Sequence, residues 1–349
     1  MSQAPDRSAV LPAGKLPHAL LSRLLEEHVA DDASVVVGPG LGRDAAVVRH
    51  DGEYLVVKSD PITFAADRAA EHLVHVNAND LACMGARPRW LLVTALFPEH
   101  GTTVDLVERT FRELRDACAG ANVVIVGGHT EITLGLDRLL LIGSMLGDVS
   151  AEGLVDSSRA RPGDRLLMTK SAGIEGTAVL AAERRSLLKA RLGVAATLEA
   201  RGMLDDPGIS IVREAALLAK GGLATALHDP TEGGISTAVH ELAAAAGLGA
   251  FISRDRVPVA GPTRSICEVL RLDPLGLLAS GSLLAAIPAD RADEAESRLD
   301  DAAIPWSWIG KLTPPEFGYR LRDGATEAEL PNFSTDEATR ALAETVADR

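Results

Sequence analysis

Carboxylate side chains stand beside apolar runs at three separate places in the sequence. Asp44 precedes an apolar run in RDAAVV, Asp60 follows one in VVKSDP, and Asn79 and Asp80 lie in the Ala- and Leu-rich segment NANDLACMGA. A charge beside apolar neighbours is costly unless it is paired. Hard oxygen donors of this kind suit Mg²⁺, which commonly joins one or two carboxylates to phosphate oxygens. Asp44 and Asp60 taken singly also fit turn or cap residues, but the set together favours a metal site.

A second candidate is the pentapeptide GGHTE at Gly127–Glu131, which follows the apolar run NVVIV. Glycines at such a place let the backbone approach a ligand closely and turn its N–H groups inward. A plain turn between a strand and a loop is the structural alternative. The pattern leaves His129 open as either a ligand contact or a hydrogen-bonded structural histidine.

The segment HDPTEGG at His228–Gly234 follows the same logic, because a strand end, a polar turn and two glycines precede a helical pattern. The N-terminus of a helix attracts anions. Thr231 as an N-cap and Glu232 as a first-turn acid are the structural alternative. The triplet EGT at 175–177 begins another helical pattern in the same way.

The histidines and cysteines give a weaker signal. His72 and His75 are three residues apart on the segment that also holds Asp80, but no third ligand spacing accompanies them, which disfavours zinc. Cys83 fits a small buried residue. The sequence contains no GxxxxGK[ST], GxSxG or HExxH motif, so a Walker loop, a serine hydrolase elbow and a zincin site are not expected.

Composition narrows the class of protein. The chain has 349 residues with a formal net charge of −14 and only 3% aromatic residues. A chain this acidic binds nucleic-acid backbones poorly. It also has few aromatic side chains on which bases could stack. Its three cysteines form no CxxC pair, its first residues lack an apolar signal core, and no apolar run is long enough for a membrane span. We expect a cytoplasmic protein with no nucleic-acid or membrane partner.

The elements that must position these residues follow from hydrophobic periodicity. After an arm and an amphipathic helix at 15–29, three short strands are expected at 34–37, 45–49 and 54–58, as a meander. A helix at 66–84, a strand at 90–96, a helix at 104–119 and strands at 122–126 and 139–146 complete the first half. The fold class is therefore α+β with mixed sheets.

The second half begins after the polar stretch 150–163. We expect strands at 165–169, 223–227, 250–253, 282–287 and 305–309. Helices are expected from 174, at 187–201 and 210–219, after the HDPTEGG loop to about 246, and at 263–270, 289–299 and 335–346. Four units are predicted: an arm with a helix at 1–33, an N-terminal domain at 34–150, a C-terminal domain at 160–325 and a terminal helix at 326–349.

The motifs GPGLGRDAAVV, VVKSDPIT, VNANDLACMGARP, VIVGGHTEIT and LHDPTEGGISTAVHELAAAAGLG resemble, in order and spacing, the PurM-like (AIR synthase-related) superfamily. The second half is most similar to the HypE branch, whose members mature hydrogenases. The resemblance implies a two-domain PurM-like fold: the N-terminal mixed sheet forms a barrel across a homodimer, and the C-terminal domain is an α/β sandwich. It also implies ATP and Mg²⁺ as cofactors.

The resemblance assigns a role to each motif residue. Asp44, Asp60 and Asp80 would bind the magnesium–phosphate group, and Asp80, His129 and Glu131 are the expected catalytic residues. The remaining matched residues would contact the nucleotide; these are Asn79, Gly127, Gly128, Thr130, Asp229, Thr231, Glu232, Gly233 and Gly234.

The implied reaction is transfer of the γ-phosphoryl group of ATP to an oxygen of a small acceptor, in the maturation of a hydrogenase-like metalloenzyme. HypE proteins carry their substrate on a C-terminal cysteine, whereas this sequence ends in ALAETVADR. We therefore expect a different acceptor. The alternatives are a small-molecule kinase similar to thiamine-monophosphate kinase, and a non-catalytic nucleotide-binding partner in a maturation complex.

Overall fold

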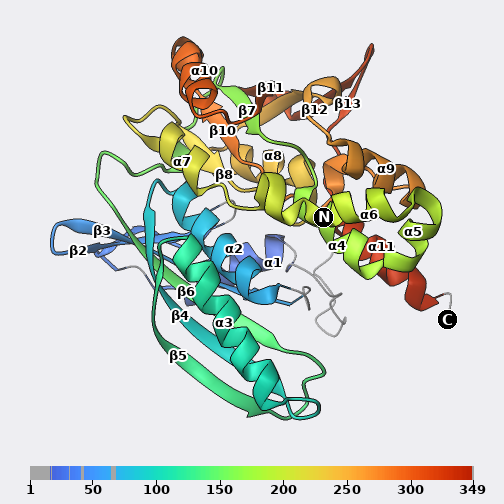
Figure 1. Ribbon diagram of the computed structural model, residues 1–349. Coiled ribbons are helices and arrows are strands. Elements are labelled where there is room, and N and C mark those ends of the chain that lie inside the picture. The colour runs from blue at the N-terminus through green and yellow to red at the C-terminus, as the bar shows by residue number, and fades with distance from the viewer. Residues whose placement is uncertain (1–15, 17, 31, 41–42, 64–67, 348–349) are drawn as a thin grey trace.

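A computed structural model describes residues 16–347 except 17, 31, 41–42 and 64–67. The expected N-terminal arm lies outside the described residues. Two β-sheets with their helices form two halves of the molecule, the first below and the second above in Figure 1. Among the described residues, no helix is long and apolar enough to cross a membrane.

The first half is built on a six-stranded sheet in the order β1-β2-β3-β6-β4-β5. Neighbouring strands are antiparallel except β4 and β5, which run parallel. The sheet does not close on itself in the described chain, and β5 is one of its two edges. Its strands are β1 (Val35–Val37), β2 (Ala46–His50), β3 (Glu53–Ile62), β4 (Arg87–Pro98), β5 (Val124–Thr133) and β6 (Leu140–Val149).

Helices α2 (Ala69–Cys83) and α3 (Val104–Gly120) pack together, α2 against β3, β4 and β6 and α3 against β5 (Figure 1). Leu73, Leu91 and Phe97 are fully buried between these layers. A shorter helix, α1 (His18–His28), precedes the sheet. This burial supplies the main stabilisation of the first half, because removing apolar surface from water is the dominant favourable term in folding.

The second half is built on a seven-stranded sheet in the order β13-β12-β9-β11-β7-β10-β8. Only β12 and β9 pair in parallel. Leu166, Leu284 and Ile309 are fully buried in its core. Its strands are β7 (Arg165–Thr169), β8 (Ala226–His228), β9 (Gly249–Ser253), β10 (Leu284–Ile287), β11 (Trp306–Thr313), β12 (Tyr319–Asp323) and β13 (Thr326–Glu329).

Eight α-helices accompany this second sheet in the described chain. Helix α8 packs on β8 and β9, and α4 packs on α6 and α9. The helices are α4 (Ile174–Glu183), α5 (Arg185–Leu192), α6 (Val194–Gly202), α7 (Val212–Ala219), α8 (Gly234–Ala245), α9 (Gly261–Leu270), α10 (Ala292–Asp301) and α11 (Glu337–Ala347).

Helix α2 joins the two halves, because its C-terminal end belongs to the core of the second one. Ala82 and Cys83 are buried in one apolar cluster with Ile211 and Leu227. The same helix contacts α7 and β8. Residues of α2 that face away from the first sheet therefore lie at the boundary between the two halves.

The predicted α+β organisation with mixed sheets is confirmed, and several details differ. The predicted helix 187–201 is two helices, α5 and α6, because Gly193 between them has φ 88° and interrupts the helical path. The unpredicted hairpin β12–β13 belongs to the second sheet. The expected boundary at 325–326 therefore falls inside this hairpin rather than before a terminal helix.

Candidate active site

A pocket of about 500 Å³ lies between the two halves. It collects side chains from β3, α2 and the loop before β2 in the first half, and from β8, α4 and α8 in the second. Its polar lining includes Arg43, Asp44, Lys58, Asp60, Thr63, His72, Asp80, Glu175, His228, Asp229, Thr231, Glu232, Glu241 and Ser280, and its apolar lining includes Leu16, Leu21, Ile62, Val76, Val179 and Leu278.

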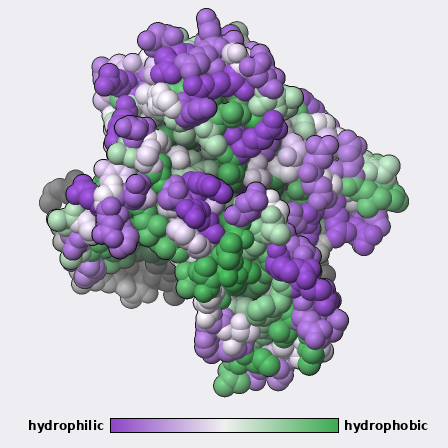
Figure 2. Space-filling model, turned by 60° about the vertical axis from the view of Figure 1, so that its left-hand side comes forward, coloured by the Kyte–Doolittle hydropathy of each residue, from purple (hydrophilic) through white to green (hydrophobic). Residues whose placement is uncertain are grey.

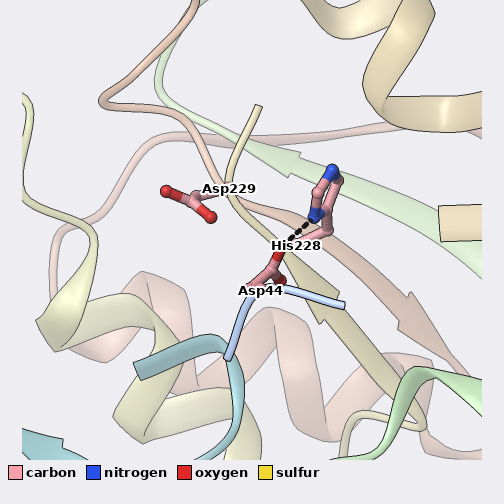
Figure 3. A group of neighbouring side chains, drawn as sticks. All are labelled: Asp44, His228 and Asp229. Atoms are coloured by element: carbon pink, nitrogen blue, oxygen red, sulfur yellow. Dashed lines mark hydrogen bonds and ion pairs between the residues drawn. The ribbon is translucent and has the colours of Figure 1, made fainter. Parts of the chain in front are cut away.

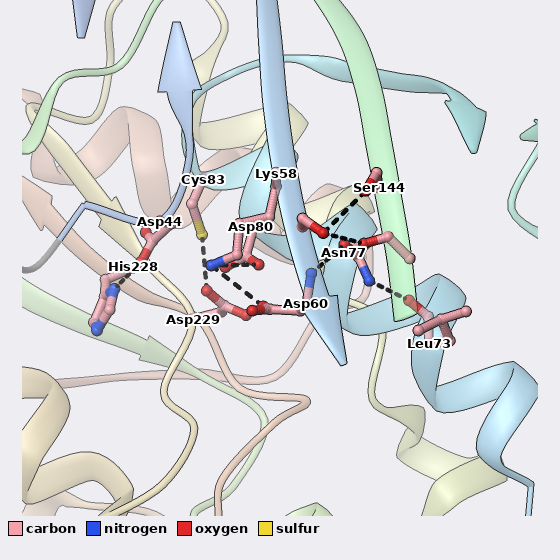
Figure 4. Close-up of polar contacts among 12 residues, drawn as sticks. Asp44, Lys58, Asp60, Leu73, Asn77, Asp80, Cys83, Ser144, His228 and Asp229 are labelled. Atoms are coloured by element: carbon pink, nitrogen blue, oxygen red, sulfur yellow. Dashed lines mark hydrogen bonds and ion pairs between the residues drawn. The ribbon is translucent and has the colours of Figure 1, made fainter. Parts of the chain in front are cut away.

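Lys58 joins two of the predicted aspartates. Its Nζ lies 3.2 Å from Asp60 Oδ2 and 3.1 Å from Asp80 Oδ2, as Figure 4 shows. Lys58 and Asp60 are two apart on β3, so the alternation of a strand places both on the same face. Asn77 holds β3 in place, because its Oδ1 accepts a hydrogen bond from the backbone N–H of Asp60 at 3.2 Å. The strand and the helix thus present one cation between two carboxylates.

Asp44, His228 and Asp229 form a second group beside the first (Figure 3). His228 Nδ1 lies 2.7 Å from Asp44 Oδ1, and His228 Nε2 lies 3.1 Å from Glu241 Oε2. One ligand atom from each of Asp44, His228 and Asp229 lies within 4.8 Å of the others. Asp44 belongs to the first half and the other residues to the second, so this group spans the boundary.

Burial and mutual repulsion set the protonation of the acidic groups. Burial, followed by the charge of Asp44, raises the pKa of Asp229 to about 7. Burial and the neighbouring Asp229 raise the pKa of Asp80 well above its ordinary value. Burial opposes protonation of His228, but Asp44 and Glu241 outweigh it and raise the pKa of the imidazole. The cluster therefore holds more negative charge than Lys58 and His228 balance, and it retains protons near neutral pH.

This donor set fits a divalent cation. Asp229 Oδ2 is buried and has no hydrogen-bond partner among the described residues, and an unsatisfied buried carboxylate oxygen is costly. Carboxylate oxygens are the donors that Mg²⁺ prefers. Both nitrogens of His228 already face carboxylates, so the oxygens of Asp44 and Asp229 suit such an ion better than the imidazole does.

Asn79 does not face the pocket, contrary to the expectation that it contacts the cofactor. Its side chain is fully buried, its Nδ2 donates to Ile209 O at 2.9 Å, and its Oδ1 accepts from the Ile211 N–H at 2.9 Å. The amide is therefore used to tie α2 to the loop before α7 in the second half. The neighbouring Asp80 does line the pocket, since adjacent helical residues point about 100° apart.

The GGHTE segment is not a loop; β5 continues through it as an edge strand. Gly128 has φ 142°, and a side chain there would collide with the Val93 backbone on β4. The segment is exposed and none of Gly127, Gly128, His129, Thr130 and Glu131 lines the pocket of the single chain. His129 Nε2 lies 3.1 Å from Glu131 Oε2 on this exposed strand.

The HDPTEGG segment divides into two parts. Asp229, Thr231 and Glu232 line the pocket, as expected. Gly233 and Gly234, at the start of α8, do not, and the Gly233 N–H donates to Asp336 Oδ2 at 2.9 Å. Both glycines have positive φ and would collide with neighbouring atoms if they carried a side chain. Packing and backbone conformation therefore explain the two glycines, rather than contact with a ligand.

Several pocket residues, Lys58 and His72 among them, carry no predicted role. Lys58 has a local signal, because the two-residue spacing to Asp60 puts both on one strand face. His72 Nδ1 lies 3.0 Å from Glu175 Oε1 on α4, a contact that no local pattern could indicate. His75 lies beside Glu71 at 3.8 Å instead, so the two histidines do not converge as a zinc pair.

Comparison with known proteins shows that two protein-family models match this chain. The N-terminal domain of AIR synthase related protein matches residues 42–149, and the C-terminal domain of AIR synthase related protein matches residues 161–320. Together these two models span most of the chain. The chain therefore belongs to the AIR synthase-related family, and the prediction of an enzyme of this superfamily is confirmed.

Individual relatives lie in the HypE branch. The carbamoyl dehydratase HypE of Azotobacter vinelandii is 29% identical over 335 residues, which covers 92% of this chain and 93% of the relative. HypE in complex with ATP matches with a TM-score of 0.70 and 26% identity, covering 94% and 97% of the two chains. The predicted resemblance to HypE hydrogenase-maturation proteins is therefore confirmed in both sequence and structure.

Two further solved structures share the fold. HypE in a HypE–HypF complex has a TM-score of 0.72 and 22% identity, covering 90% of this chain and 99% of that one. AaThiL complexed with AMPPCP and TMP has a TM-score of 0.67 and 20% identity, covering 90% and 94%. The two-domain PurM-like architecture is therefore confirmed.

Proposed function

We propose that the chain is an ATP-dependent enzyme that binds Mg–ATP in the pocket between its two halves and transfers the γ-phosphoryl group to an oxygen of a small uncharged acceptor. The observation that carries this proposal is the convergence of Asp44, Asp60, Asp80 and Asp229 with Lys58 around one pocket. A similar chain, HypE, is known in complex with ATP.

Phosphoryl transfer needs positioning and charge neutralisation more than covalent help from the protein. Bound Mg²⁺ would neutralise charge on the phosphate oxygens, with Asp44, Asp60, Asp80 and Asp229 as the residues that hold it. The Lys58 ammonium would contact a phosphate oxygen as a fixed cation. The acceptor oxygen forms a bond to the γ-phosphorus while the bond to the bridging oxygen breaks, and ADP leaves with that electron pair.

The acceptor is proposed to be a carbamoyl group or a chemically similar amide, because the relatives at 29% identity are named carbamoyl dehydratase. All three cysteines, Cys83, Cys118 and Cys267, are buried. None of them presents an exposed thiol that could carry the acceptor, so a free small molecule or a group on a partner protein is the proposed form. A maturation partner is supported by the HypE–HypF complex of a similar fold.

A second candidate is a kinase that acts on a small phosphorylated metabolite, which the shared fold with AaThiL in complex with AMPPCP and TMP favours. Incubation of the chain with Mg–ATP and thiamine monophosphate distinguishes the two. Formation of thiamine diphosphate would select the kinase, and ADP release that requires a carbamoyl compound would select the first proposal.

Isothermal titration with Mg–AMPPNP tests the nucleotide site directly. The wild-type chain should bind, and Asp80→Asn should lower the affinity by about tenfold or more, since a lost charge-assisted contact is worth roughly 1.5–3 kcal/mol. The exposed Asp290→Asn is the matched control and should bind as the wild type does. Absence of binding by the wild type, or equal binding by Asp80→Asn, overturns the proposal.

We also propose that the chain forms a homodimer through β5. This edge strand exposes Val124, Val126 and Ile132 at 61, 53 and 63%. Figure 2 shows apolar surface gathered over the lower arm of the molecule, where β5 runs in Figure 1. An unpaired apolar edge strand is a template for pairing with another chain, and a second copy would also bring a GGHTE segment to this surface.

A further inference from the structure

A buried pair, His72 on α2 and Glu175 on α4, lines part of the pocket. The His72 side chain is 2% exposed and that of Glu175 is 10% exposed. His72 Nδ1 lies 3.0 Å from Glu175 Oε1. His72 Nε2 has no hydrogen-bond partner among the described residues, although His72 lines the pocket.

The pair fixes which ring nitrogen is free to accept. An ionised carboxylate only accepts hydrogen bonds, so its contact with Nδ1 favours the tautomer in which Nδ1–H donates to Glu175 Oε1. In the neutral ring Nε2 then offers a lone pair. A buried acceptor without a donor is costly, and a ligand that supplies an N–H removes that cost.

The surroundings of this nitrogen differ from those of the aspartates. His72 and Asp80 are eight residues apart on α2, which separates their backbones by about 12 Å along the helix axis. The side chains of Val76, Val179 and Leu278 line the pocket as well. The pocket thus has an acidic end around Asp80, where the phosphates are proposed to bind, and the His72–Glu175 pair lies about two helical turns from Asp80 along α2.

We propose that His72 Nε2, oriented by Glu175, binds the N–H of an uncharged carbamoyl or carboxamide group and so forms the acceptor subsite. This inference rests on the proposed function. An anionic ligand is disfavoured by Glu175 and the nearby aspartates. A primary amide satisfies Nε2 through one N–H and leaves its oxygen free to face the phosphate end. Glu175 acts here as a positioning residue, because its Oε1 lies 3.0 Å from His72 Nδ1 and so orients the ring.

The test uses the full chain labelled with ¹⁵N-histidine and saturated with Mg–AMPPNP. Methyl carbamate and acetamide are titrated as probes, and the His72 Nε2 resonance is assigned by its absence in His72→Gln. We expect a resonance typical of an unprotonated nitrogen, which moves on addition of a probe. Probe affinity should fall by about tenfold in His72→Gln, while Mg–AMPPNP affinity stays within about twofold.

Two further variants keep the outcome decisive. His75→Gln is the control, because His75 lies on the same helix but does not line the pocket. This variant should bind the probes as the wild type does. Glu175→Gln keeps an oxygen opposite Nδ1 but removes the charge. It should move the free Nε2 resonance before any probe is added, which a purely structural contact elsewhere would not do.

The inference is overturned if neither probe moves the wild-type Nε2 resonance, or if His72→Gln binds both probes unchanged. An equal loss of Mg–AMPPNP and probe affinity in His72→Gln would place His72 at the nucleotide instead. Failure of the wild type to bind Mg–AMPPNP appears before any probe is added; it overturns the proposed function and the acceptor role together.

Discussion

His228 Nδ1 lies 2.7 Å from Asp44 Oδ1, and this buried contact links the two halves of the molecule beside the pocket. The second ring nitrogen of His228 faces Glu241. An imidazole between two carboxylates is held in its protonated form, and the pKa of His228 is raised for that reason in spite of its burial. The link is therefore ionic, and it responds to pH.

The first prediction concerns that pH response. The folded-state pKa of His228 is above the unfolded value of about 6.5, so its stabilisation is complete below pH 6.5 and is lost as pH rises through the folded-state pKa. His228→Gln should lower the free energy of unfolding by about 3–5 kcal/mol at pH 6 and by less at high pH. Urea unfolding between pH 6 and 9 measures this; a difference that does not change with pH contradicts it.

The second prediction concerns proton release on metal binding. Asp229 has a pKa of about 7, so a divalent cation must displace a proton from the cluster below that pH. Affinity for Mg²⁺ should rise by up to about tenfold per pH unit below pH 7 and level off above it. Titration calorimetry in two buffers of different ionisation enthalpy gives the number of protons released. Asp229→Asn should weaken binding and flatten the pH dependence.

The same group affects stability without metal. The carboxyl of Asp229 has a higher pKa in the folded chain than in the unfolded one, so the folded state binds more protons and its stability falls as pH rises from about 4 to 7. In Asp229→Asn, the free energy of unfolding should therefore decrease less between about pH 4 and pH 7 than it does in the wild type. An equally steep fall in the variant would show that Asp229 is not its source.

The third prediction concerns Lys58, which separates the carboxylates of Asp60 and Asp80. Lys58→Met keeps the length of the side chain and removes the charge, which leaves two acids without their cation. We expect Mg–AMPPNP affinity to fall by about tenfold, and Lys58→Arg to retain part of it. The exposed Lys311→Met serves as the control, and an unchanged affinity in Lys58→Met contradicts the assignment.

The fourth prediction separates the neighbours Asn79 and Asp80. Asn79→Ala leaves two buried backbone groups, Ile209 O and the Ile211 N–H, without their partner. Each such loss costs about 1–3 kcal/mol, so the melting temperature should fall clearly. Nucleotide affinity of the folded variant should stay within about twofold of wild type, because Asn79 does not line the pocket. A stable variant that loses nucleotide binding would restore Asn79 as a ligand contact.

The fifth prediction concerns the edge strand β5. A lysine in place of Val126 or Ile132 puts a charge on the proposed contact surface, so the dimer should dissociate to a monomer in light scattering at micromolar concentration. Val194→Lys, at an exposed position on α6 in the second half, should leave the dimer intact. A monomeric wild type under the same conditions overturns the dimer proposal.

Much of the pocket could be predicted because its aspartates carry local signals. Asp44, Asp60 and Asp80 each stand beside apolar residues, and Asp229 follows a strand that ends at a polar turn. What a local pattern does not contain is the partner across the fold. The His72–Glu175 contact and the Asp44–His228 contact join segments far apart in the chain, so only the packed structure defines them.

The end of strand β5 shows a second limit of prediction from local sequence. The predicted strand at 122–126 stops at Gly127, because glycine usually ends a strand. In the structure β5 runs on to Thr133, since parallel pairing with β4 supplies hydrogen bonds that local propensity does not record. Because of this pairing, His129 and Glu131 lie on the exposed edge strand of the sheet rather than beyond the end of the strand.

Helix α2 carries His72 and Asp80 on the first half, whereas Glu175, His228 and Asp229 come from the second. Any hinge motion between the halves would therefore pull apart the charges that a ligand must touch together. A ligand that contacts residues of both halves would therefore add its binding free energy to the contacts that hold the halves together.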